Sequence, residues 1–370
     1  MRQTCCAIVL LGGLLVAAGG AGPAAQVKPS ALRAVPAETT AAKAKDPSWR
    51  PPRTPWGHPD LEGIWTSDDM RGIPTARPAA QAGRESLTPE EFARRAGGDE
   101  TSRDRAVNQE TFLRNEFGVR TFGYTSFIVD PPDGHMPVLT ELGLARSKAT
   151  AGVGTFGTRP FNGFDDFSLY DRCITRGVGG IFPVLYGNGL LIAQTPDAVV
   201  ISYEMVHDTR VIPLDNRPRV APAIKQYMGD ARGHWEGDTL VVETTNFNGT
   251  VDFFGVLHGD RATLTERFTR IDPQMIDYRL RLDDPATLSA PFTVRLTITQ
   301  QPGYRLYEYS CHEGNTAVSS ALGGERAYER AVADAVAKGL PVPPRTTGFE
   351  VYSGGNVEGR QPVREIGTGR

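Results

Sequence analysis

The second half of the chain is a series of short segments in which apolar and polar residues alternate, separated by turn residues. In segment 292–299, four apolar residues alternate with three threonines and an arginine. Successive side chains of a strand point to opposite faces, so this pattern predicts a strand with one apolar and one polar face. Turn sequences such as Thr195-Pro196-Asp197 and Asp272-Pro273-Gln274 separate the segments. We expect strands at 64–66, 190–194, 199–203, 210–214, 233–235, 239–244, 263–271, 277–282, 292–299 and 305–311.

The fold class predicted from these segments is mainly β with a few peripheral helices. Short strands joined by turns favour an antiparallel barrel or a sandwich, and a barrel with inward polar faces would enclose a pocket. The sequence has no βαβ rhythm, no GxGxxG motif and no phosphate-binding loop, so nothing in it supports nucleotide-dependent chemistry.

Three helices and one further hairpin are also predicted. Thr88-Pro89-Glu90-Glu91 has the residues of a capping box, and the helix that it starts is expected to end at Gly97-Gly98. A short helix over 140–148 would be capped by Thr140, and 325–338 is amphipathic. Two apolar segments, 127–129 and 136–139, flank a Pro/Gly turn and suggest a hairpin.

The N-terminus has the organisation of a secretory signal peptide. Arg2 precedes a short apolar stretch, residues 7–18, and a tail of small residues. An uncleaved anchor is the alternative, and the glycines in this stretch favour cleavage near Ala25. We expect an exported protein, periplasmic or secreted, without a membrane span once the signal is removed. The predicted divisions are a signal peptide (1–25), a flexible linker (26–55), a single mostly-β domain (56–340) and an extended tail (341–370).

Cysteine usage agrees with export. Cys5 and Cys6 belong to the predicted signal peptide, which leaves Cys173 and Cys311. Two remaining cysteines in an oxidising compartment are a candidate disulfide, and two separate buried thiols are the alternative.

The charge distribution restricts the class of partner. The formal net charge is -3, and no basic stretch of the kind that binds nucleic acid occurs. A small-molecule substrate or ligand is the expected partner, and the oligomeric state stays open.

Three motifs support a family resemblance. They are Pro59-Asp60-Leu61-x-Gly63-x-Trp65, the stretch 229–244 that contains WEGDTLVVET, and Tyr307-Glu308-Tyr309-Ser310-Cys311-His312-Glu313-Gly314-Asn315. The chain resembles a large group of uncharacterised exported bacterial proteins, over roughly residues 59–315. The resemblance implies export and a single domain, but no particular reaction. The WEGDTLVVET stretch is also similar to strand pairs of lipocalin-like barrels, which makes a lipocalin-like barrel the favoured form of the fold.

The strongest candidate for chemistry is His312, next to Glu313 at the predicted end of a strand. His312 could act as a general base, with Glu313 or Glu308 orienting its second ring nitrogen. Asn315, in the same turn, is a candidate for substrate binding. The alternative is that His312 and Asn315 only satisfy backbone groups beside a disulfide.

Two further clusters contain histidine. In the first, His207 and Glu204 are candidate acid/base residues and Arg210 is a candidate for substrate binding; a solvated hairpin tip is the alternative. In the second, His234 and Trp235 precede a predicted turn. Trp235 with Tyr203, Tyr307 and Tyr309 could form an aromatic wall for a sugar or aromatic ligand, although aromatic residues in strands more often belong to the core.

No cofactor is expected, and a divalent metal ion stays possible only through long-range assembly. His207, His234, His258 and His312 are the candidate ligands, but the sequence has no compact HxH or HExxH spacing.

The leading functional hypothesis is an exported hydrolase or lyase that uses histidine and carboxylate acid/base chemistry on a small extracytoplasmic substrate. The alternative is a non-catalytic periplasmic ligand-binding protein of lipocalin-like form. Turnover that depends on His312 would favour the first, and saturable binding without turnover the second.

Overall fold

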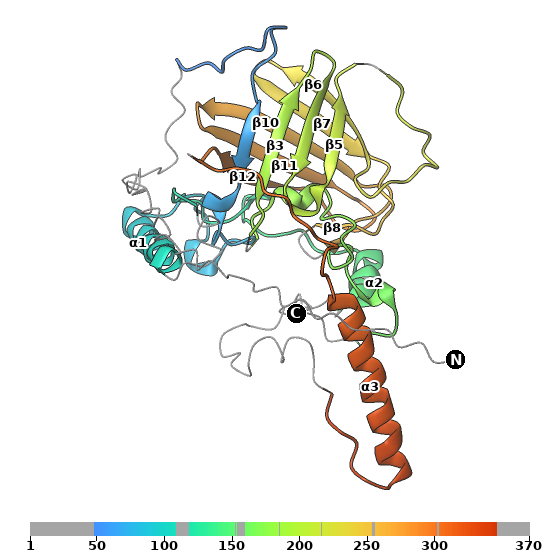
Figure 1. Ribbon diagram of the computed structural model, residues 1–370. Coiled ribbons are helices and arrows are strands. Elements are labelled where there is room, and N and C mark those ends of the chain that lie inside the picture. The colour runs from blue at the N-terminus through green and yellow to red at the C-terminus, as the bar shows by residue number, and fades with distance from the viewer. Residues whose placement is uncertain are drawn as a thin grey trace, which may run out of the picture. The chain divides into compact units, whose positions relative to one another are not determined.

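The structure is a computed structural model, and its largest element is one antiparallel sheet of ten strands (Figure 1). The predicted signal peptide 1–25, and the ends of the chain beside it and at the C-terminus, lie outside the described residues. The described residues are 48–108, 118–151, 153, 160–184, 186–215, 217–253, 256–301 and 303–345.

Most strands of the sheet lie in a single order in which each strand is hydrogen-bonded to the next. This arrangement confirms the predicted mainly β fold class. A tenth strand, β2 (Ile128–Asp130), pairs with β12 outside this order, and β8 (Asp252–Phe253) and β9 (Val256–Leu257) form a small separate hairpin. The order is β5 (Thr209–Pro213), β4 (Ala198–Tyr203), β3 (Gly189–Gln194), β1 (Gly63–Thr66), β12 (Phe292–Thr299), β11 (Met275–Asp283), β10 (Thr263–Asp272), β7 (Thr239–Thr245) and β6 (Asp230–Glu236).

The two edge strands, β5 and β6, approach each other without pairing. A Cβ atom built on Gly233 of β6 would lie 2.9 Å from Cγ2 of Ile212 in β5. The sheet therefore curls until its edges are in contact, but the ladder of hydrogen bonds does not close into a barrel. Glycine suits position 233 because a side chain there would press against those of Ile212 and Leu214.

The predicted alternation is visible in the burial of the strands. Val294, Leu296 and Ile298 of β12 are fully buried, as expected for the inner face. Thr297 and Thr299 are buried as well, because the chain also covers the opposite face there. Oη of Tyr124 lies 3.0 Å from Oγ1 of Thr297, and Thr299 donates to the Asp69 carboxylate at 2.6 Å. Part of the polar face is therefore a second buried layer.

An ion pair lies inside the curled sheet. Arg210 of β5 donates to both carboxylate oxygens of Glu266 in β10, at 3.0 and 2.6 Å, and both residues are buried. Tyr278 of β11 also donates to Glu266, at 3.0 Å, and Oη of Tyr203 in β4 lies 3.4 Å from Nη1 of Arg210. Buried charges need such partners, so these side chains join strands from different parts of the sheet.

Helix α1 (Pro89–Asn108) begins as predicted and ends later than predicted. Thr88 and Glu91 form the capping box, with N–H to side-chain distances of 2.8 and 3.3 Å. The helix continues through Gly97 and Gly98, because neither residue adopts the positive φ that would turn the chain out of a helix. The expected end at these glycines is therefore wrong.

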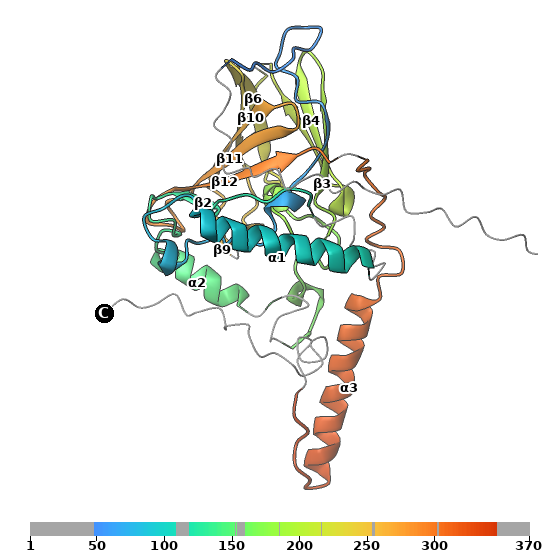
Figure 2. The same ribbon diagram turned by 90° about the vertical axis from the view of Figure 1, so that its left-hand side faces the viewer.

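The other two helices lie near their predicted positions. Helix α2 (Glu141–Thr150) starts at Thr140, whose hydroxyl accepts from the Gly143 amide at 3.0 Å, as predicted. Helix α3 (Ala317–Ala337) starts earlier than residue 325. Figures 1 and 2 show α1 and α2 beyond the same end of the sheet. Within the described ranges, no helix has the length and apolar character needed to cross a membrane.

Two predicted pairings are wrong. Strand β2 pairs with β12 and not with segment 136–139, so the expected hairpin does not form. Segment 303–311 contains no strand, although 305–311 was expected to pair with 292–299. Strand β11 pairs along one side of β12, and β2 and β1 pair with its other side, so the segment has no free edge there.

Candidate functional site

An open groove of about 420 Å³ lies between two segments that are far apart in the sequence. One wall consists of Tyr170, Asp171 and Tyr186, and the other of residues 308–311, 313–315 and Ala317. We call it the tyrosine groove, because three of its lining side chains are tyrosines. Its volume is within the range of small-molecule sites.

A disulfide joins the two walls. Cys173 and Cys311 are bonded across a sequence separation of 138 residues, with their Cα atoms 5.8 Å apart, as predicted. Asn315 adds contacts beside the disulfide, because its Nδ2 lies 3.5 Å from both the Asp171 carbonyl oxygen and Cys173 Sγ. The relative position of the walls therefore depends on this bond.

The first wall is a tight turn stabilised by its own side chains. The Ser168 hydroxyl donates to the Asp171 carboxylate at 2.8 Å and accepts from the Asp171 amide at 3.1 Å. The Cys173 amide donates to the Tyr170 carbonyl at 2.9 Å. Serine and aspartate favour such local bonds over regular structure, which explains why this segment forms neither helix nor strand.

The second wall is anchored to the sheet through Glu204, which follows β4. Its carboxylate accepts from the Tyr304 hydroxyl at 2.6 Å and from the Tyr307 amide at 3.4 Å. Burial raises the pKa of Glu204, and these two bonds act in the opposite direction. Gly189 leaves the space that the carboxylate fills, since a side chain there would collide with Glu204 and Tyr304.

The tyrosines of the groove contact one another. The hydroxyls of Tyr170 and Tyr309 are 2.9 Å apart, and the rings of Tyr186 and Tyr309 are stacked with centroids 6.2 Å apart. Burial raises the pKa of both Tyr170 and Tyr309. The phenols are therefore protonated at neutral pH and can donate hydrogen bonds to a ligand.

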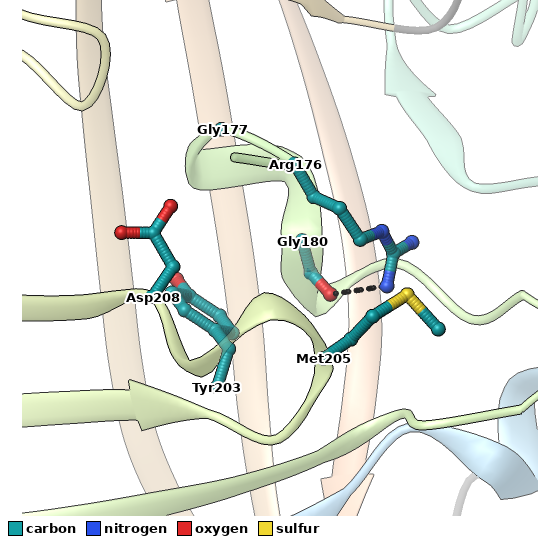
Figure 3. Close-up of a pocket in the computed structure, with 6 residues that line it drawn as sticks. All are labelled: Arg176, Gly177, Gly180, Tyr203, Met205 and Asp208. Carbon is teal, nitrogen blue, oxygen red and sulfur yellow. Dashed lines mark hydrogen bonds between the residues drawn. The ribbon is translucent and has the colours of Figure 1, made fainter. Parts of the chain in front are cut away.

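A small closed pocket near the first wall contains Arg176 (Figure 3). Figure 3 shows its guanidinium turned towards Gly180, with Asp208 on the other side of the pocket. The guanidinium donates to the carbonyls of Gly180 and Phe182, at 3.3 and 3.2 Å. Burial lowers the pKa of Arg176. Arginine stays protonated in proteins, so this region keeps a positive charge.

The structure places part of the predicted His312 cluster at the groove. Glu313 and Asn315 line the second wall. His312 lies between lining residues and is exposed to solvent. The Tyr307 side chain, 58% exposed, points away from the core but is not among the lining residues.

The His207 cluster is divided between surface and core. His207 is exposed in the turn η6 (Met205–His207) and has a φ of +55°. Glu204 is buried and anchors the second wall. Arg210, the candidate for substrate binding, has its guanidinium on Glu266 in the core.

His234 and Trp235 lie on β6, and neither is among the residues of the groove. His234 is exposed, with Nε2 3.1 Å from Oε1 of Glu236. The Trp235 ring lies against the His58 ring, with centroids 5.4 Å apart. Of the four residues expected to form an aromatic wall, Tyr309 alone lines the groove.

The candidate metal ligands occupy different environments. His207, His234 and His312 are exposed, whereas His258 is 1% exposed. Across the described ranges, no group of three or more His, Cys, Asp or Glu side chains could hold a metal ion.

His258 is expected to make stability depend on pH. Burial lowers its pKa to about 4, with Asp284 raising and Arg146 lowering the value. Between its ordinary pKa of about 6.5 and about 4, the unfolded chain binds a proton that the folded chain does not, so stability falls as pH falls. The expected loss between about pH 7 and about pH 4 is about 3 kcal/mol.

The measurement is urea unfolding of wild type and His258→Gln across this pH range. The difference in unfolding free energy between the two proteins should change by about 3 kcal/mol. Taking the difference between the two proteins cancels the contributions of Glu204 and Asp208. Burial raises the pKa of both carboxyl groups, so their protonation stabilises the fold as the pH falls, which is opposite to the effect of His258. A difference independent of pH would contradict the prediction.

Sequence reasoning did not identify Tyr170, Tyr186 or Arg176. The sequence did contain a signal for two of them, because Tyr170 stands three residues before Cys173 and Arg176 three residues after it. If the two cysteines are bonded, the neighbours of each must lie close to those of the other. Tyr186 has no such signal.

Comparisons with models of protein families, with curated proteins and with solved structures find no match.

Proposed function

We propose that this protein is exported and binds a small polyhydroxylated ligand, such as a saccharide, in the tyrosine groove. The observation that carries the proposal is the combination of three tyrosines with carboxylate and amide side chains in one open groove. Aromatic ring faces pack against the C–H face of a sugar, while carboxylates and amides bond to its hydroxyls. The disulfide supports an oxidising compartment, as does the signal-like N-terminus.

The curled sheet serves in this proposal as a barrel-like scaffold of lipocalin type. Its interior is filled by core side chains such as Phe268 and Tyr278, which are fully buried. The ligand would therefore bind outside the sheet, between loops, and not within the barrel as in the sequence-based alternative.

Replacing Tyr309 with alanine is expected to weaken saccharide binding by about ten-fold or more, because the ring lies in the groove and contacts both other tyrosines. The measurement is calorimetric titration of the disulfide-bonded protein with a panel of neutral and charged monosaccharides and disaccharides. Tyr227→Ala is the control, since Tyr227 is exposed and does not line the groove. No saccharide binding by the wild type, or equal affinities in the two variants, would overturn the proposal.

A second candidate function, hydrolysis or elimination by His312 and Glu313, uses the same groove. Glu313 lines the groove, and the exposed position of His312 at its rim favours access to a bound ligand. The same titrations, followed by product analysis, test this candidate: His312→Ala would keep binding and lose turnover, and binding without any turnover in the wild type would exclude catalysis of these ligands.

A further inference from the structure

The lining of the tyrosine groove is acidic. Asp171, Glu308 and Glu313 line it, and none of the described residues that line it is a lysine, arginine or histidine. A cleft lined by one sign of charge concentrates ligands of the opposite sign.

Two of these carboxylates are available to a ligand. Ser168 occupies the carboxylate of Asp171. Glu308 and Glu313 are exposed, and within the described ranges neither side chain has an ion-pair or hydrogen-bond partner. The guanidinium of Arg176, near the first wall, is turned towards the carbonyls of Gly180 and Phe182.

The aromatic lining favours the same class of ligand. Tyr186 and Tyr309 both line the groove, and their rings are stacked at an interplanar angle of 23°. A cation over such a ring is attracted by its quadrupole, and the attraction grows when water is excluded. Carboxylates and phenol rings together therefore form a lining that discriminates by charge, in addition to bonding hydroxyls.

We propose that the groove selects a ligand that carries a positive charge, and specifically an amino-substituted sugar with a protonated amine. The inference rests on the proposed function, since it names the substrate class of the same groove. The amine would lie at Glu308 and Glu313, with the sugar ring against Tyr309.

The test compares three sugars of the same ring size: glucosamine, which is cationic, and N-acetylglucosamine and glucose, which are neutral. Each is titrated calorimetrically into the disulfide-bonded protein at about pH 6. Glucosamine is expected to bind about ten-fold more tightly than the other two. The preference should weaken as the ionic strength rises from about 0.02 to about 0.5 M, because salt screens exposed charges.

A double variant, Glu308→Gln with Glu313→Gln, is expected to lose the preference for glucosamine over glucose and N-acetylglucosamine. Glu90→Gln with Glu100→Gln is the matched control, since it removes the same charge from exposed positions on α1. Equal binding of the three sugars by the wild type, or an unchanged preference in the first variant, overturns charge selection and leaves saccharide binding standing. Binding of none of the sugars by the folded protein overturns the proposed function, and charge selection with it.

Discussion

Replacing Cys173 and Cys311 with serine is expected to lower the unfolding free energy by about 5 kcal/mol. The bond closes a loop of 138 residues, and a cross-link over a loop of that length removes much of the conformational freedom of the unfolded chain. The measurement is denaturant unfolding followed by tryptophan fluorescence, for the oxidised wild type and for the double variant. A loss below about 1 kcal/mol would contradict the prediction.

Loss of the disulfide is also expected to abolish binding in the tyrosine groove. Glu204 would still accept from Tyr304, and Asn315 of the second wall would still donate to Asp171 of the first, but those contacts are hydrogen bonds that open on their own. Adding reductant to the oxidised wild type should reproduce the effect without any substitution. The double serine variant, treated with the same reductant, controls for effects unrelated to the disulfide.

Replacing Glu266 with glutamine is expected to cost about 3–5 kcal/mol. The substitution leaves Arg210 charged and buried without the carboxylate that compensates its charge. An uncompensated buried charge is costly because it has lost its hydration. Removing both charges, with Arg210→Met and Glu266→Met together, is expected to restore most of the stability. Asp215→Asn is the control, since the pair of Asp215 with Arg217 is exposed and should contribute less than about 1 kcal/mol.

Denaturant unfolding of the wild type, Arg210→Met, Glu266→Met and the double variant gives the coupling energy of the pair. If the losses in unfolding free energy of the two single variants add up to the loss in the double variant, the coupling energy is zero and the prediction is contradicted. If Glu266→Gln is as stable as the wild type, Arg210 must have gained another partner on substitution.

Most of the sheet could be predicted from the sequence because its strands alternate with a period of two. The hairpins around Thr195-Pro196-Asp197 and Asp272-Pro273-Gln274 form where the turn residues indicate. Segment 305–311 contains residues typical of a strand, but a strand also needs a free neighbour, and β12 has none. Pairing partners depend on the whole sheet, and local sequence does not contain that information.

The candidate site was predicted less well, for a related physical reason. Cys173 and Cys311 could be predicted as a pair, and Glu313 and Asn315 as functional residues beside one of them. Tyr170 and Arg176 lie in a region without hydrophobic periodicity, so no pattern assigned them a position. The histidines were less informative, since His258 is buried in the core and neither His207 nor His234 lines the groove.

The close approach of β5 and β6 has a consequence for how molecules of this protein meet. The outer edge of an open sheet offers unpaired N–H and C=O groups to any extended chain, including another copy of itself. Here the two edges face each other across Gly233, where Ile212 and Leu214 pack against it. The contact between β5 and β6 thereby protects both edge strands from pairing with another molecule, although no hydrogen bonds join the two strands. Gly233 allows the close approach on which this protection depends.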